Sequence, residues 1–197
     1  MKKETGFTLV EALLSATILA IIGIIMVSLL QQSFQLNSKS QLISKIKQNG
    51  QNALNTIDEA VRNADSIECP LPNGTSGPLI LVTVKNGTYI RFNIHTESAN
   101  NGYLGEEMFP SSPGLNKSYC NYSDVPINLV SEAILTDKTD PITGTSLKNI
   151  AGDGFSSSTN NSITVKFHLG PSVQAPNKFD SQTSNILFQT TLTVRQR

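Results

Sequence analysis

The sequence predicts an α+β protein in which a long N-terminal helix packs against the antiparallel β-sheet of a globular head. Three observations support this class. Residues 12–30 are apolar and carry no charge, and an amphipathic repeat follows them to about residue 67. Short runs rich in β-branched residues then recur to the C-terminus. At 197 residues the chain has the length of one ordinary domain plus an extension.

The first element, residues 12–30, has the length that a membrane requires. An α-helix rises about 1.5 Å per residue, so some 20 apolar residues cross a hydrocarbon core of about 30 Å. A cleaved secretory signal fits poorly, because the run exceeds the usual core of about 7–15 residues and no small-x-small cleavage site follows it. Lys2 and Lys3 predict a cytoplasmic N-terminus, with the rest of the chain outside.

Glu11 is the feature that a simple anchor does not explain. It is the one charged residue between Phe7 and Leu30, and the next basic residue is Lys39. A carboxylate at mid-membrane costs about 2.5–3.5 kcal/mol on insertion scales, and less near the interface. The partner of Glu11 is therefore expected to be a cation on another chain or one that is made by processing.

The segment Lys-Lys-Glu-Thr-Gly-Phe-Thr-Leu-Val-Glu, residues 2–11, resembles the prepilin cleavage and methylation motif of type IV pilins and type II secretion pseudopilins. The resemblance implies that a prepilin peptidase cuts between Gly6 and Phe7 and methylates the new amino group of Phe7. This cation would then pair with Glu11 of a neighbouring subunit, because a buried ion pair is tolerable where a lone buried charge is not.

The residue patterns and this resemblance together predict four parts. Residues 1–6 are a leader peptide, 7–30 a transmembrane and filament-core helix, 31–67 its amphipathic continuation, and 68–197 the head with long loops. Many major pilins have a helix-kinking proline near the position of Ser28, which this chain lacks. Residues 53–64 and 188–195 look like the corresponding segments of larger minor pilins and J-type pseudopilins.

We therefore expect a structural subunit, a minor pilin or pseudopilin, of a type IV pilus or type II secretion-type filament. Its expected partners are other pilin or pseudopilin subunits, the prepilin peptidase and the inner-membrane assembly platform. Before assembly it would be a single-pass protein of the cytoplasmic membrane with its head in the periplasm or outside the cell. An anchored surface-binding protein or adhesin that does not polymerise is the alternative, and an anchored enzyme is a further rival.

The helix is expected to continue beyond the membrane. Its second half shows apolar residues three or four apart, with charged residues largely between them. The apolar positions are Leu36, Ile43, Ile46, Ala53, Leu54, Ile57, Val61 and Ala64. Gly50 is a weak point of this helix. The stripe predicts packing against the core of the head, and contact with a separate partner helix is the alternative.

Asn86-Gly87 between two β-rich runs predicts a hairpin. The strands expected in the head are residues 79–84, 88–94, 127–135, 162–169 and 186–194. In the last of these, Ile186, Phe188, Thr190, Leu192 and Val194 share one face by alternation. Residues 97–124 and 136–161 are rich in Gly, Pro, Asn, Ser and Asp and predict long loops, which carry either partner contacts or tolerated variation.

The two cysteines, Cys69 and Cys120, are too few for a metal cage and enough for one disulfide. Outside the cytoplasm we expect them to be oxidised to each other. Closing a loop of about 50 residues stabilises a fold by roughly 4 kcal/mol in the chain-entropy model. Free thiols, or bonds to other chains, remain as alternatives.

The sequence predicts no catalytic residue, no cofactor and no metal. His95 and His168 lack a Cys, Asp or second His at ligand spacing, which favours structural histidines. Asp137, Asp140 and Asp153 lack the alternation of a calcium loop, so a solvated acidic turn is favoured. Acidic and basic residues balance at 15 each, and no basic stripe with aromatic residues gives direct evidence for nucleic-acid binding.

Overall fold

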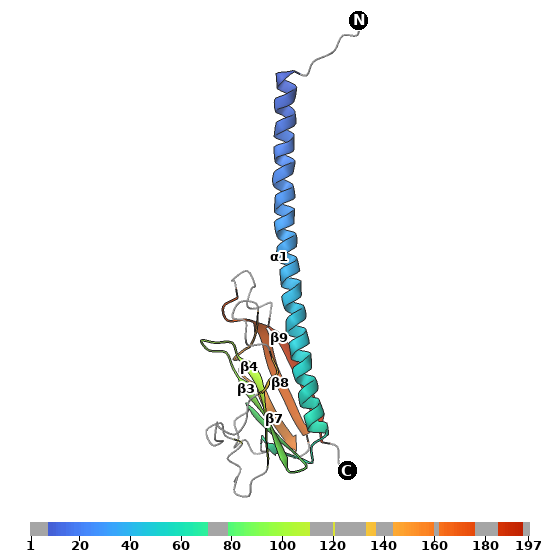
Figure 1. The fold of residues 1–197 in the computed structure, drawn as a ribbon, viewed down its shortest axis with the longest axis vertical. Helices are drawn as coiled ribbons and strands as arrows, with labels where there is room; N and C mark the ends of the chain where they lie inside the picture. Colours follow the sequence, from blue (N-terminus) through green and yellow to red (C-terminus); the bar gives the residue numbers. More distant parts are fainter. Residues whose placement is uncertain are drawn as a thin grey trace. The chain divides into compact units, whose positions relative to one another are not determined.

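The computed structural model describes residues 8–70, 79–110, 120, 133–136, 144–159, 162–175 and 185–194. The chain divides into two units, residues 1–41 and 42–197. In the described ranges helix α1 comes first and strands β1 to β9 follow. The predicted α+β architecture, one long N-terminal helix with antiparallel sheets, is confirmed (Figure 1).

Helix α1 (Leu9–Arg62) is continuous, in keeping with a sequence that has no proline before Pro70. It ends earlier than the predicted residue 67. Asp65 donates a backbone hydrogen bond to the carbonyl oxygen of Val84 (2.7 Å), and the chain then pairs as β1 (Ser66–Cys69). Residues that the helical pattern alone assigned to α1 therefore form a strand, because they pair with a neighbouring strand.

The second part of α1 buries one stripe in the head. The buried positions are three or four apart: Ile46, Gly50, Ala53, Ile57 and Val61. The sequence predicts all of them except Gly50. Leu36 was expected in this stripe, but it lies in the N-terminal unit with 68% of its surface exposed. Gly50 is a packing position, because a Cβ there would lie less than 3.0 Å from the ring of Phe188.

The first sheet has the order β1-β2-β3-β4-β5, and every neighbouring pair is antiparallel. The further strands are β2 (Ile80–Lys85), β3 (Thr88–His95), β4 (Tyr103–Pro110) and β5 (Ala133–Ile134). The predicted hairpin is confirmed, since Asn86 (φ 49°) and Gly87 (φ 73°) form the left-handed turn between β2 and β3. The Asn86 backbone N–H donates to Asp65 Oδ2 at 2.8 Å.

The second sheet is centred on β8 (Ser162–Pro171). Along one side β8 pairs with β9 (Ile186–Thr193). It also pairs with β6 (Thr145–Leu147) near its end and with β7 (Gly154–Thr159) near its start. Figure 1 shows β8 and β9 beside the teal part of α1.

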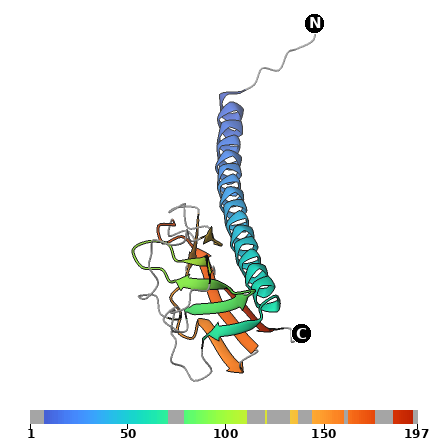
Figure 2. The same cartoon turned by 60° about the horizontal axis from the view of Figure 1, so that its bottom comes forward.

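One hydrophobic core joins the helix stripe to both sheets. It contains Ile57 from α1, Phe92 from the first sheet, and Phe155, Phe167 and Phe188 from the second. Figure 2 shows the green strands of the first sheet crossing the orange strands of the second. The single sheet expected from the sequence is therefore corrected to two sheets around a common core.

Two segments predicted as loops contain strands. Residues 97–124 include β4, and residues 136–161 include β6 and β7. Of the strand predicted over residues 127–135, Ala133–Ile134 form β5, while residues 127–132 lie outside the described ranges. The strands predicted at 162–169 and 186–194 are confirmed with small changes of boundary, and Phe188 and Leu192 face the core as expected.

Candidate functional site

The start of α1 fixes Glu11 in the first helical turn. Thr8 caps the helix, because its Oγ1 accepts a hydrogen bond from the Glu11 backbone N–H (3.3 Å) and its carbonyl oxygen accepts one from Ala12 N–H (3.2 Å). Thr-x-x-Glu is the spacing of a capping box, a signal that could have identified Thr8 from the sequence. A carboxylate in this turn also faces the positive end of the helix dipole.

The hydroxyl groups of the apolar segment bond to the helix itself. Ser15 Oγ donates to the carbonyl oxygen of Glu11 (2.8 Å), and Thr17 Oγ1 to that of Leu13 (2.7 Å). Ser28 Oγ donates to the carbonyl oxygen of Ile25 (2.8 Å). In hydrocarbon a polar group without a partner costs several kcal/mol, so these bonds make the segment compatible with a lipid environment.

The apolar side chains of the N-terminal unit are uncovered in the isolated chain. Every residue from 9 to 38 is exposed, and individual values reach 76% at Leu9 and 71% at Ile24. An apolar surface of this extent is unfavourable in water at about 25 cal/mol per Å². The segment is long and apolar enough to cross a membrane. Lipid, or the apolar helices of other subunits, would cover it.

The predicted processing site lies at the edge of this segment. Gly6 and Phe7 are outside the described residues, so cleavage after Gly6 and N-methylation of Phe7 remain predictions from the sequence. The described chain begins at Thr8, and Glu11 follows within one helical turn. The pairing of Glu11 with the processed N-terminus of another subunit likewise remains a prediction.

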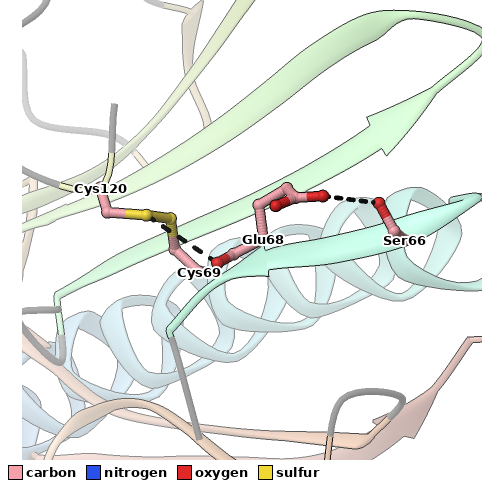
Figure 3. The surroundings of a disulfide bond; sticks show 4 residues. All are labelled: Ser66, Glu68, Cys69 and Cys120. Atoms are coloured by element: carbon pink, nitrogen blue, oxygen red, sulfur yellow. Dashed lines mark hydrogen bonds between the residues drawn. A yellow bond between two sulfur atoms is a disulfide. The ribbon is translucent and has the colours of Figure 1, made fainter. Parts of the chain in front are cut away.

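A disulfide joins Cys69 to Cys120 in the head, with Cα atoms 5.8 Å apart (Figure 3). Cys69 is the last residue of β1 and is fully buried, and Cys120 is 5% exposed. Both lie in a second apolar cluster with Ile80, Val82 and Phe109. The bond fastens a residue distant in sequence to the strand that directly follows α1.

Two candidate residues that looked unrelated in the sequence meet in the structure. The Asp153 carboxylate, 2% exposed, lies 2.8 Å from His168 Nδ1 and accepts the His168 backbone N–H at 3.0 Å. Asp153 thus holds a histidine and a strand in place, and it does not sit in a solvated turn as predicted. His95 stacks on Tyr103 with ring centroids 4.2 Å apart. Asp137 and Asp140 lie outside the described ranges.

One carboxylate at the border of the helix and the first sheet has a shifted pKa. Burial raises the pKa of Glu106 on β4, and the nearby negative charge of Glu59 on α1 raises it further. Among the described residues, no group of three or more His, Cys, Asp or Glu side chains is placed to hold a metal ion.

Comparison with known families agrees with the geometry of the N-terminus. Residues 1–27 match the family model described as the prokaryotic N-terminal methylation motif. No curated protein and no solved structure matches the chain. The motif covers the start of α1, the segment in which Thr8 caps the helix and Glu11 occupies the first turn. This motif and the helix that carries it support a type IV pilin-like protein of the prepilin type.

Proposed function

We propose that the chain is a minor pilin or pseudopilin, a structural subunit that waits in the cytoplasmic membrane and is then drawn into a filament. One observation carries the proposal: an exposed apolar helix whose start lies within a methylation motif and whose first turn holds a carboxylate. The apolar surface has to be shielded from water, and the Glu11 carboxylate has to pair with a cation.

The order of events follows from the shielding of the apolar surface and the pairing of Glu11. In the membrane, lipid covers the apolar segment while Lys2 and Lys3 keep the N-terminus in the cytoplasm. The prepilin peptidase then cuts after Gly6, and the methylated amine of Phe7 becomes the new N-terminus. On entry into the filament at the assembly platform, helices of other subunits replace lipid, and the Phe7 amine of one subunit meets Glu11 of another.

The uninterrupted helix supports a minor pilin or pseudopilin. From Leu9 to Arg62 the helix has no proline, and Gly23 has no neighbouring atom within 4 Å of where a Cβ would lie. The residue that kinks the helix of many major pilins is therefore missing from α1.

Glu11 variants provide the test. Glu11→Ala and Glu11→Val should be produced and processed like the wild type but should be strongly depleted from sheared filaments relative to the membrane fraction. Ser15→Ala is the matched control, one turn further along, because Ser15 Oγ donates to the Glu11 carbonyl oxygen of its own helix. Incorporation of both Glu11 variants at the wild-type level would contradict the role of the ion pair.

A non-polymerising anchored adhesin makes a different prediction for the same fractions. Such a protein keeps residues 1–6 and stays in the membrane fraction whatever residue stands at position 11. N-terminal sequencing of the membrane and filament fractions separates the two functions.

A further inference from the structure

Three side chains from distant parts of the sequence meet at one end of the second sheet. Lys148 follows β6, Glu97 lies two residues after β3, and Asn185 directly precedes β9. β6 and β9 flank β8 on opposite sides, and the register places Ser146 opposite Gly170 and Ile186 opposite Leu169. Lys148 and Asn185 therefore approach the end of β8 from both sides.

The amine of Lys148 is held in a fixed position. Its Nζ donates to Glu97 Oε2 at 2.7 Å and to the carbonyl oxygen of Pro171 at 3.0 Å, and the side chain is 13% exposed. Glu97 is also positioned, because its Oε2 accepts a hydrogen bond from Ser146 Oγ at 3.0 Å. Ser146 Oγ in turn accepts the backbone N–H of Gly102 at 3.0 Å.

The carboxamide of Asn185 reaches the same place. Its Oδ1 is buried and has no hydrogen-bond partner among the described residues. A Cβ at position 170 would lie less than 3.0 Å from both Asn185 Oδ1 and Lys148 Cε. Because Gly170 has no side chain, the side chains of Lys148 and Asn185 can both occupy the space beside it.

We propose that Lys148 and Asn185 form an intramolecular amide bond, with Glu97 as the group that carries the proton. These are the components of a transamidation: a partly buried amine, a carboxamide and a carboxylate in contact with the amine. The proposal goes beyond a filament role and is independent of the methylation motif.

The reaction balances without a further reagent. The Lys148 ammonium passes a proton to Glu97 Oε2, and the free amine attacks Cγ of Asn185. The Nζ–Cγ bond forms and the Cγ–Nδ2 bond breaks. Nδ2 takes up the proton left on Nζ and the proton held by Glu97, and it leaves as ammonium. Glu97 returns to its carboxylate form, and no atom is oxidised or reduced.

The product would tie β6 to β9 across β8. Such a bond restricts the unfolded chain in the same way as a disulfide, and a reducing agent would not break it. Together with Cys69–Cys120, it would give each sheet of the head one covalent tie.

Mass spectrometry of the purified full-length chain tests the proposal. After reduction and denaturation, the intact mass should fall short of the mass expected for the processed sequence by one ammonia. Trypsin should not cut after Lys148, and the peptide that contains Asn185 should be found joined to it. The linked fraction should be close to complete in the wild type and zero in Lys148→Arg, Asn185→Ala and Glu97→Gln.

Lys166→Arg is the matched control, because Lys166 lies in β8 and its side chain faces Asp153 instead of Asn185. This variant should retain the mass deficit. Glu97→Gln keeps both reacting groups, so a linked product in that variant would overturn the role of Glu97. A wild-type chain with the full unlinked mass and normal cleavage after Lys148 would overturn the proposal, whatever the folding of the variants.

Discussion

The contact between Gly50 and Phe188 gives a quantitative test of how α1 packs on the head. A Cβ at position 50 would lie less than 3.0 Å from three ring atoms of Phe188. The ring has little room to move, since it is 8% exposed and stacks on Phe167 with centroids 5.4 Å apart. Gly50→Ala therefore forces the helix or the ring to shift.

Two opposing effects determine how much Gly50→Ala changes the free energy of unfolding. Overpacking of a core costs typically about 1–3 kcal/mol, while alanine in place of glycine stabilises a helix by about 1 kcal/mol. We expect Gly50→Ala to lower the free energy of unfolding by about 0–2 kcal/mol. In a Phe188→Leu background the ring atoms are absent, so the same change should stabilise the head by up to about 1 kcal/mol.

The comparison of the two backgrounds isolates the energy of the contact between position 50 and the Phe188 ring. Urea denaturation of the four detergent-solubilised full-length chains, followed by tyrosine fluorescence of the head, gives the coupling energy of a double-mutant cycle. The expected coupling is about 1–3 kcal/mol. An equal effect of Gly50→Ala in both backgrounds would refute the packing argument.

Two further perturbations probe the head. Cys69→Ser with Cys120→Ser should lower the free energy of unfolding by roughly 4 kcal/mol, because the bond closes a sequence separation of 51 residues; denaturation curves that overlay the oxidised wild type would contradict this. The pKa of Glu106 is raised by burial and then by Glu59, so its contribution to stability is complete below the ordinary value of 4.5 and is lost as the pH rises through the raised value. Glu106→Gln should therefore gain stability relative to the wild type across that window, and a pH-independent difference between their urea midpoints would exclude the effect.

The long N-terminal helix and the strands β2, β3, β8 and β9 could be predicted because their sequence signals are local. The composition of residues 12–30 predicts a membrane-length helix, and Asn86-Gly87 predicts a hairpin turn because both residues readily adopt a positive φ. The strands β8 and β9 also show their inward residues by alternation, as Phe188 and Leu192 do. In each case the prediction depends on residues that are close together in the sequence.

The missed elements depend on partners that are distant in sequence. β4 contains Gly105, Glu106 and Glu107, and it is a strand because all eight of its residues pair with β3. β7 is rich in serine and reads as a loop, yet it pairs with β8. Asp153 and His168, or Glu97 and Lys148, are too far apart along the chain for spacing to indicate that they meet.

The central claim is that this chain is processed for assembly, and the N-terminus of the mature protein tests it most directly. Mass spectrometry of the N-terminal peptide from the filament fraction should find a chain that begins with N-methylated Phe7. Gly6→Ala should abolish that species and leave the precursor in the membrane. A filament-borne chain that still carries residues 1–6, or a Gly6→Ala chain that begins at N-methyl-Phe7, would contradict the account.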